Sequence, residues 1–574
     1  MTGGKVLVIG DDTRSFLATV RSLGRQGVTV HAAPSNFRSP ALRSRYIAAI
    51  HDLPPWMRDG AEWLGALTEL LRAERYDLVI PCNETALLPL QCYREALSRF
   101  ARLAIPHDRA IALLFDKIET RALAQQVGVP VAAGRLLSPT DTADRLLTEL
   151  GSPIVLKPRR SYSLEQLASR GKVEVIKEPA RLERLLGTLD SGETIVESYF
   201  SGQGVGVSVL AGGGRVLQAF QHHRVREIAG ESFYRHSAPL SPEFVAACEA
   251  IVAGSDYTGV AMFEFKRKPS GDWILLEVNA RPWGSMALPV ALGVDFPYRW
   301  YRLLTAAEEA PAVPYRTGVY GRNLLPDLYV CLRQAEARSL GPVATAWLIT
   351  RWVAEMSRTL IGKEVHDVLV RDDPRPGVVE LFALARAAGG VIGRRLPGVA
   401  ARRRRRARAE LNRLRHNPAN LDIVFVCQGN ICRSPFAEAL LRARLGNSCV
   451  AIRSAGLMPR PGRATPSDGR EAASAHGVDL SEHRSVWLNR NMVETASLVV
   501  AFDEITRSGI FDRYPDIKAP VILLGDLVQL GDITDPIDGG AAEFRRIYQQ
   551  IAAGIAELLA RLHGLAARHP GRPI

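Results

Sequence analysis

The stretch VFVCQGNICRSPFAEALLRARL, residues 424–445, decides the fold of the carboxy-terminal part of the chain. Apolar β-formers lead into Cys427, and Arg433 opens a helix after a short loop. The backbone N–H groups of residues 428–433 can surround an anion there, and Arg433 offers a two-pronged donor to phosphate oxygens. Arg433 and the helix N-terminus favour a thiolate at Cys427, to which Ser434 can donate its hydroxyl. The sequence therefore predicts a nucleophilic cysteine in a phosphate-binding loop; the alternative is a buried structural thiol beside a helix cap.

The longer pattern C-x-G-N-I-C-R-S-P resembles the low-molecular-weight protein-tyrosine phosphatases over about residues 421–566. Three more pieces follow in that family's order, namely SAG at 454–456, HRS at 483–485 and DP at 535–536. The resemblance implies a compact α/β domain with a central parallel sheet and no cofactor. It also implies a role for each motif residue: Cys427 as nucleophile, Arg433 as phosphate clamp, Asn430 and Ser434 as loop-ordering groups, Asp535 as general acid and then base, and Cys432 as a thiol able to form a protective disulfide with Cys427.

The sequence departs from the family where aromatic side chains usually wall the pocket. Leu457 and Met458 follow the SAG piece, and Ile537 follows the DP pair. A phosphotyrosine protein remains the expected substrate, and another phosphomonoester is the alternative.

Charge is concentrated in one segment of the 574-residue chain. The net charge is +13, and residues 394–415 contain ten arginines and one acid, so this segment supplies +9 of it. Because the rest is nearly neutral, no specific nucleic-acid partner is expected. The helix-prone run at 399–416 is interpreted as a solvated linker, with weak electrostatic contact to an anionic membrane as the alternative.

The amino-terminal part alternates apolar runs with helical patterns, beginning with KVLVI at 5–9. This alternation predicts parallel α/β structure. Gly10 is not followed by the two further glycines of a dinucleotide-binding loop, which argues against that function. Further along, two antiparallel hairpins are predicted, with turns at 212–214 and 269–272. Residues 311–390 are predicted to be mostly helical.

Three oxygen-bearing side chains are predicted to lie together on the second hairpin. Glu277 and Asn279 are two apart on one predicted strand, so they share a face, and Glu264 stands on the preceding strand. These hard oxygen ligands suit Mg²⁺. The alternative is a solvated strand face with incidental acids.

With its surroundings, the piece E-V-N-A-R-P-W-G-S resembles the ATP-grasp superfamily, in particular carboxylate–amine ligases that look like carbamoyl-phosphate synthase, over about residues 1–305. That resemblance implies that ATP and a carboxylate form an acyl phosphate, which an amine then attacks. The implied residues are Lys117, Lys157, Glu197 and Tyr199 for ATP, Glu264, Glu277 and Asn279 for Mg²⁺, and Arg281 and Arg224 for the substrate. His223 either faces the substrate as well or is a surface histidine.

The loop that covers the ATP phosphates is usually rich in glycine in this superfamily. Here it should lie within residues 157–175, where Gly171 is the only glycine. Arg159, Arg160 and Ser161 are candidates to replace backbone contacts with side-chain contacts.

These observations predict a multidomain α/β protein: a Rossmann-like lobe (1–105), α+β ATP-grasp lobes (106–305), a helical region with the arginine-rich linker (306–420) and the phosphatase domain (421–566). No signal peptide or membrane-spanning helix is recognised, so a cytoplasmic location and reduced thiols are expected. The predicted function is a bifunctional phosphatase and Mg-ATP-dependent ligase using small carboxylate and amine substrates. The alternative is a phosphatase regulated by a non-catalytic ATP-binding sensor.

Overall fold

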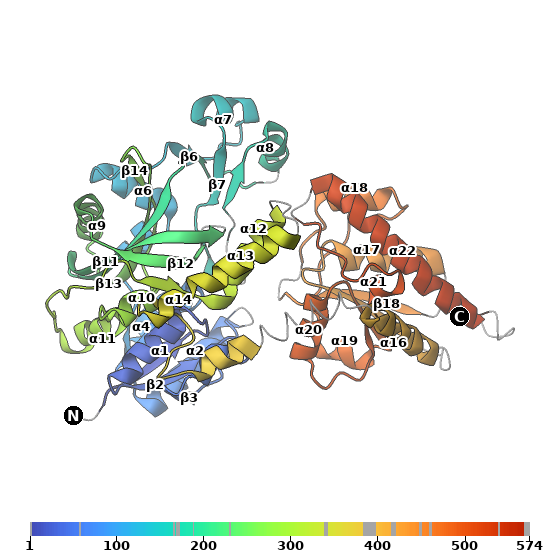
Figure 1. The fold of residues 1–574 in the computed structure, drawn as a ribbon, viewed down its shortest axis with the longest axis horizontal. Coiled ribbons are helices and arrows are strands. Elements are labelled where there is room, and N and C mark those ends of the chain that lie inside the picture. The colour runs from blue at the N-terminus through green and yellow to red at the C-terminus, as the bar shows by residue number, and fades with distance from the viewer. Residues whose placement is uncertain are drawn as a thin grey trace. The chain divides into compact units, whose positions relative to one another are not determined.

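The structure is a computed structural model. It describes residues 3–56, 59–164, 167, 171, 173–187, 189–228, 231–337, 342–382, 398–414, 421–446, 450–458, 462–537 and 540–566. The chain forms two compact units, Met1–Ala385 and Arg386–Ile574 (Figure 1). Among the described residues, no helix is both long and apolar enough to cross a membrane.

The first unit begins with a five-stranded parallel sheet, as the alternation of strands and helices predicted. The strand order is β3-β2-β1-β4-β5, and apolar side chains of β1 and β4 are fully buried between helices. Its elements are β1 (Lys5–Ile9), α1 (Ser15–Arg25), β2 (Thr29–Ala33), the 3-10 helix η1 (Pro40–Arg43), β3 (Ile47–Ile50), α2 (Gly60–Glu74), β4 (Leu78–Pro81), α3 (Glu84–Cys92), α4 (Arg94–Leu97) and β5 (Arg102–Leu103).

A small four-stranded antiparallel sheet, in the order β6-β9-β7-β8, forms the next lobe. Its core contains Leu146, Ile154, Leu182 and Val196, which α7, α8 and the sheet bury together. The elements are α5 (Asp108–Leu114), α6 (Lys117–Gln126), β6 (Gly134–Leu136), α7 (Ala143–Leu150), β7 (Ile154–Pro158), β8 (Glu174–Ile176), α8 (Pro179–Leu186) and β9 (Thr194–Ser198).

A seven-stranded sheet, in the order β14-β13-β10-β11-β12-β15-β16, completes the first unit. Both predicted hairpins are present, and Gly213 and Gly214 adopt positive φ at the first turn. The elements are β10 (Gln203–Gly212), β11 (Arg215–Ile228), β12 (Glu231–Ala238), α9 (Pro242–Gly254), β13 (Gly259–Arg267), β14 (Trp273–Asn279), α10 (Ala287–Ala291), α11 (Phe296–Ala306), β15 (Tyr320–Arg322), α12 (Leu324–Ala337), α13 (Pro342–Glu355), α14 (Ser357–Leu360) and β16 (Glu364–His366).

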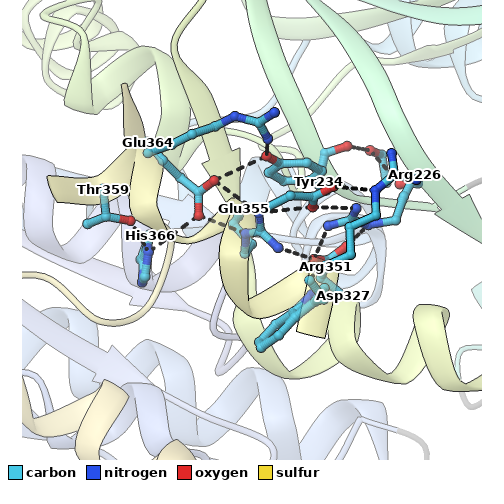
Figure 2. A network of polar contacts seen from close by, with 12 residues as sticks. Arg226, Tyr234, Asp327, Arg351, Glu355, Thr359, Glu364 and His366 are labelled. Atoms are coloured by element: carbon cyan, nitrogen blue, oxygen red, sulfur yellow. Dashed lines mark hydrogen bonds and ion pairs between the residues drawn. The ribbon is translucent and has the colours of Figure 1, made fainter. Parts of the chain in front are cut away.

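The region after residue 311 is not a separate helical segment. Strands β15 and β16 add to the seven-stranded sheet, and each has only three residues, too few to leave a periodic pattern in the sequence. A buried ion-pair network joins this addition to α12 and α13 (Figure 2). Asp327 accepts hydrogen bonds from Arg226 at 2.7 Å, Arg322 at 2.9 Å and the Trp352 indole at 2.7 Å. These contacts fix α12 and α13 against the sheet.

The second unit contains a four-stranded parallel sheet, in the order β18-β17-β19-β20, as predicted for the carboxy-terminal domain. Helices α17, α18 and α22 enclose its larger core together with the sheet. The elements are α16 (Val399–Leu414), β17 (Asp422–Cys427), α17 (Arg433–Leu445), β18 (Ala451–Gly456), α18 (Ser467–Ser474), α19 (Arg490–Thr495), β19 (Leu498–Ala501), α20 (Glu504–Arg513), β20 (Val521–Leu523), α21 (Leu524–Leu527) and α22 (Gly540–Ala566).

The arginine-rich run forms helix α16, and this helix is not a solvated linker. Ala407 and Leu411 are buried in the hydrophobic core of the second unit, at 4% and 5% exposure. Arg403 forms a two-pronged salt bridge with Asp526, with distances of 2.8 and 3.1 Å. The apolar positions spaced four apart were too few to outweigh the arginines when the sequence was considered alone.

Candidate active sites

The loop between β17 and α17 wraps around the sulfur of Cys427. The Asn430 N–H donates to Cys427 Sγ at 3.1 Å, and Ser434 Oγ lies 3.1 Å from the same sulfur. Asn430 adopts a φ of +50°, a left-handed conformation that asparagine tolerates better than most residues. Cys427 is 2% exposed. The loop thus aims donors at the sulfur, as the sequence predicted.

The Asn430 side chain holds this loop in place. Its amide nitrogen donates to Ser434 Oγ at 2.9 Å and to Ser454 Oγ at 2.8 Å. Its carbonyl oxygen accepts from the Val486 N–H at 2.7 Å, and the Asn430 backbone carbonyl accepts from His483 Nε2 at 2.8 Å. The SAG and HRS pieces of the sequence therefore meet at Asn430.

Arg433 connects the loop to two aspartates. Its guanidinium forms salt bridges with Asp503 and with Asp535, the latter at 2.7 Å, and donates to the Ile533 carbonyl at 2.8 Å. Arg433 is 1% exposed. Burial opposes its charged form, but the charges of Asp535, Cys427 and Asp503 outweigh burial and raise the pKa of Arg433. A permanent positive charge therefore sits beside the Cys427 sulfur.

The second thiol, Cys432, has a different environment. Burial and the charge of Asp535 raise the pKa of Cys432 far above its ordinary value. Its carbonyl accepts from the Tyr548 hydroxyl at 3.0 Å. Cys432 is therefore a protonated thiol at neutral pH, which leaves Cys427 as the candidate nucleophile.

Apolar side chains follow the SAG and DP pieces of the sequence and are partly or largely exposed. Met458 and Ile537 are 41% and 39% exposed, and Leu457 is half-buried. The sequence analysis overlooked Trp487. The backbone of this residue forms a β-bridge with Gly456, and the residue is 39% exposed. Arg513 stacks on the Trp487 ring at 4.2 Å and donates to the Leu457 carbonyl.

The first unit contains a pocket between the small antiparallel sheet and the edge of the seven-stranded sheet. Its lining residues are Glu84, Leu114, Phe115, Lys117, Thr120, Arg121, Val131, Ser161, Glu197, Leu275, Leu276, Glu277, Val278, Asn279 and Ala280. Lys117, Glu197, Glu277 and Asn279, four residues predicted from the sequence, therefore face one pocket.

Basic groups pair with Glu197, which lines this pocket. Lys157 Nζ pairs with Glu197 Oε2 at 2.5 Å, and Arg121 pairs with Glu197 Oε1 at 3.3 Å. Lys117 Nζ donates to Ser161 Oγ at 3.0 Å. These two lysines and Glu197 lie together although they come from α6, β7 and β9.

The three predicted metal ligands also meet. Glu264 and Glu277 are direct partners in the β13–β14 pairing, and Asn279 Nδ2 donates to Glu264 Oε1 at 3.1 Å. Arg224 Nη2 contacts Glu264 Oε2 at 2.6 Å. The charges of Glu264 and Glu227 outweigh burial and raise the pKa of Arg224. Carboxylate and amide oxygens are the ligand types that hard divalent cations accept, and here Glu264 is paired with Arg224.

Arg281 connects this cluster to the first sheet. It donates to Asn279 Oδ1 at 3.2 Å and to Glu84 Oε1 at 3.0 Å. Glu84 is the first residue of α3 and lines the pocket, so the Rossmann-like lobe supplies a group to this site.

Four further residues that the sequence singled out have the following surroundings. His223 does not face the same side as Arg224, because neighbouring residues of β11 point to opposite faces; His223 contacts Gln221 and stacks edge-on with His236. Arg159 and Arg160 bind Asp116, the N-cap of α6, at 2.6 and 3.0 Å, so both guanidinium groups have a protein partner.

Tyr199 is 42% exposed and does not line the pocket; its ring lies 5.3 Å from Lys266 Nζ. Much of the loop expected to cover ATP phosphates, residues 165, 166, 168–170 and 172, lies outside the described residues.

Several site residues were missed by sequence reasoning. Asp503 lies between β19 and α20 as the N-cap of that helix, and this placement between a strand and a helix was the available signal. Arg121 and Glu84 had no such signal, because each reaches the pocket only through the tertiary fold.

The carboxy-terminal site has the geometry of a cysteine-dependent phosphatase: a sulfur in a loop of donors, a buried arginine and a nearby aspartate. The family model for low molecular weight phosphotyrosine protein phosphatase matches residues 422–566. A probable low molecular weight protein-tyrosine-phosphatase, EpsP, of Ralstonia nicotianae is 35% identical over 143 residues, 25% of this chain and 97% of the relative. The protein-arginine-phosphatase of Bacillus subtilis is 37% identical over 147 residues, 25% of this chain and 94% of the relative. Through this domain the chain belongs to the low-molecular-weight phosphotyrosine phosphatase family.

The amino-terminal site has a separate match. The family model described as ATP-grasp in the biosynthetic pathway with Ter operon matches residues 190–323, which include the three predicted metal ligands. A crystal structure of L-amino acid ligase from Bacillus licheniformis shares 18% identity and a TM-score of 0.42, covering 54% of this chain and 78% of that chain. The protein is thus an enzyme with a low-molecular-weight phosphatase domain, and its residues 190–323 match an ATP-grasp family model.

Proposed function

We propose that the carboxy-terminal domain hydrolyses phosphomonoesters through a phosphocysteine intermediate. The observation that carries the proposal is the convergence of the Asn430 N–H, Ser434 and Arg433 around Cys427. The Cys427 thiolate attacks phosphorus, and the bond from phosphorus to the leaving oxygen breaks while Asp535 supplies a proton to that oxygen. Asp535 then takes a proton from water, which attacks phosphorus, breaks the S–P bond and releases phosphate.

The proposed substrate is a phosphotyrosine protein. Support comes from the matching family model and from the exposed Trp487 ring beside the SAG loop. The second candidate is phosphoarginine, a phosphoramidate in which Asp535 would protonate a leaving nitrogen instead of an oxygen; it is favoured by the similarity to a protein-arginine-phosphatase and by the aliphatic Leu457 and Ile537.

Phosphate release from matched phosphotyrosine and phosphoarginine peptides distinguishes these two substrates. Cys427→Ser is expected to abolish release from the preferred peptide, because serine is a far weaker nucleophile than a thiolate. Unchanged hydrolysis by Cys427→Ser would disprove the phosphatase proposal for both substrates.

We infer further that the amino-terminal domain is an ATP-dependent carboxylate–amine ligase. The carrying observation is one pocket that brings together Lys117, Glu197, Glu277 and Asn279, with Lys157 paired to Glu197. Lys117 and Lys157 would hold ATP phosphates, and Arg281 and Arg224 the carboxylate substrate. Glu264, Glu277 and Asn279 would hold Mg²⁺, which would offset phosphate charge. The alternative, an ATP sensor without turnover, is supported by the glycine-poor loop at 157–175 and by the engagement of Arg159 and Arg160 with Asp116.

ADP release separates the ligase from the sensor. The full chain is incubated with Mg-ATP and pools of amino acids and small carboxylates, and Glu277→Gln is the comparison. A ligase releases ADP only with a suitable pool, and the variant loses this release. Binding of Mg-ATP without substrate-dependent ADP from any pool would favour the sensor.

We propose a cytoplasmic location. The earlier alternative of weak membrane contact through the arginine-rich run loses support, because α16 packs its apolar side into the second unit.

A further inference from the structure

Two histidines, a glutamate and a tyrosine meet on the first sheet, and none of them lines the ATP-grasp pocket. His31 lies on β2, His51 directly follows β3, Glu74 ends α2, and Tyr76 lies two residues beyond it. The cluster therefore joins two neighbouring strands and the helix that covers them.

The donor atoms of this cluster are close together. His31 Nδ1 lies 2.9 Å from His51 Nε2 and 2.9 Å from the Tyr76 hydroxyl oxygen, and His51 Nε2 lies 3.2 Å from that oxygen. Glu74 Oε2 is 3.9 Å from His31 Nδ1. One ring nitrogen of each histidine and a Glu74 oxygen all lie within 4.8 Å of one another.

Hydrogen bonds alone do not account for all three of these short contacts. An imidazole nitrogen carries either one proton or one lone pair in the ring plane, so it makes one good hydrogen bond there. His31 Nδ1 nevertheless has two partners at 2.9 Å, which are themselves in contact. Three mutual contacts among two such nitrogens and one hydroxyl therefore exceed the two good hydrogen bonds that they can form.

We propose that His31, His51 and Glu74 bind a divalent transition-metal ion of the Zn²⁺ type. Imidazole nitrogen with one carboxylate suits Zn²⁺, Co²⁺ or Ni²⁺ and not Mg²⁺, so this site is chemically distinct from the one at Glu264. Two nitrogens on one Zn²⁺ lie about 3.3 Å apart at tetrahedral angles, which requires a shift of only a few tenths of an ångström here. The ion would join β2, β3 and α2 as a structural link.

Lys5 sets the strength of this site. Its ammonium group contacts Glu74 Oε2, the same oxygen that the ion would use, and also donates to the Glu74 carbonyl at 3.1 Å. A fixed positive charge beside the ligands opposes a second cation. Removing that charge should therefore strengthen metal binding, an effect opposite in sign to the loss of a histidine.

The test is a Co²⁺ titration of the full chain in excess Mg²⁺, which occupies the proposed site at Glu264, followed by visible absorption. We expect one equivalent with bands of nitrogen and oxygen ligation and without thiolate charge-transfer absorption. His51→Ala and Glu74→Gln should weaken binding at least tenfold. Lys5→Met should tighten it, and His476→Ala, in the second unit, should change nothing.

Two controls exclude the other metal-binding groups of the chain. Glu277→Gln removes a proposed Mg²⁺ ligand and Cys427→Ser removes the reactive thiol, and both variants should bind Co²⁺ like the unmodified protein. Unchanged Co²⁺ affinity in His51→Ala, weaker affinity in Lys5→Met, or loss of binding in Cys427→Ser would each overturn the proposal. Lys5→Met is expected to strengthen Co²⁺ binding, so it tests the proposal even if a histidine variant fails to fold.

Discussion

Arg433 Nη2 and Asp535 Oδ2 lie 2.7 Å apart although 102 residues separate them in the chain. The arginine of the cysteine loop and the aspartate of the DP pair are therefore one cluster with Cys427. Arg433 is buried, and its guanidinium is also the group proposed to hold the substrate phosphate. The same arginine can thus serve the substrate and the proposed acid in turn.

Replacing Asp535 by Asn should slow hydrolysis most for substrates with poor leaving groups. An asparagine cannot supply the proton, and general acid catalysis typically contributes 10²–10⁴-fold. The measurement is kcat/KM, which reports the steps up to departure of the leaving group, for phenyl phosphate and for p-nitrophenyl phosphate, whose leaving group needs less help. Asp516→Asn is the matched control, because Asp516 is exposed and pairs with Arg490. An equal loss on both substrates would argue against an acid role.

Replacing Asn430 by Ala should disorder the cysteine loop. The change removes side-chain hydrogen bonds to Ser434, Ser454 and the Val486 N–H, and it places alanine at a φ of +50°. We expect kcat for p-nitrophenyl phosphate to fall at least tenfold and the second unit to lose about 2–4 kcal/mol of stability. Thermal unfolding and kinetics on the same preparation check both effects, and full activity would contradict the proposed role of Asn430.

Replacing Lys157 by Met should weaken Mg-ATP binding at least tenfold. A salt bridge with Glu197 holds Lys157 beside the pocket. The substitution removes a positive charge that is proposed to face the ATP phosphates. Isothermal titration with Mg-ATP measures the change, with the exposed Lys177→Met as control. Phosphatase activity should stay unchanged in both variants. Equal affinity in both would show that Lys157 does not hold ATP.

Replacing Asp327 by Asn should destabilise the first unit by about 3–5 kcal/mol. The change leaves the buried Arg226 and Arg322 without an anionic partner that they share. Asp108→Asn, at an exposed salt bridge with Arg94, should cost less than about 1 kcal/mol. Calorimetry that resolves the transition of each unit provides the measurement, and a cost as small as that of the control would exclude a structural role for the network in Figure 2.

The first unit should lose stability as the pH rises from 4.5 to 7. Burial, and then the charge of Asp367, raises the pKa of Glu380 from 4.5 to about 7. The unfolded chain releases this proton first, so the folded state binds more protons across the window and stability falls with rising pH. Glu380→Gln should flatten this fall and add about 2–3 kcal/mol at pH 8. Urea unfolding at pH 5 and pH 8 tests it, with the exposed Glu309→Gln as control; a fall of equal size in Glu380→Gln would assign the pH dependence to other groups.

Much of the phosphatase site could be predicted because its groups are close in sequence. Cys427, Asn430, Arg433 and Ser434 share one strand–loop–helix, whose conformation follows from local pattern. Glu264 and Glu277 could be placed together because a short hairpin turn fixes their register. The roles of these residues remain proposals, but the sequence predicted which of them lie close together.

The remaining features depend on packing that no local pattern encodes. Asp503 reaches Arg433 from another strand, and Glu84 reaches Arg281 across 197 residues. In strand β11, His223 and Arg224 are adjacent, and the alternation of side chains along a strand places them on opposite faces. The expected domain boundaries, with the linker ending at residue 420, stay predictions, although α16 already packs with the second unit.

The burial of Ala407 and Leu411 determines where this chain can be divided. A fragment that starts at residue 421 retains every proposed catalytic group and nevertheless exposes the part of its core that α16 covers. Such a fragment would expose an apolar surface to water and would also lose the salt bridge between Arg403 and Asp526. A fragment that starts at Gly398 keeps both. For expression and crystallisation of the phosphatase alone, the usable start of the domain therefore lies more than twenty residues ahead of its first strand.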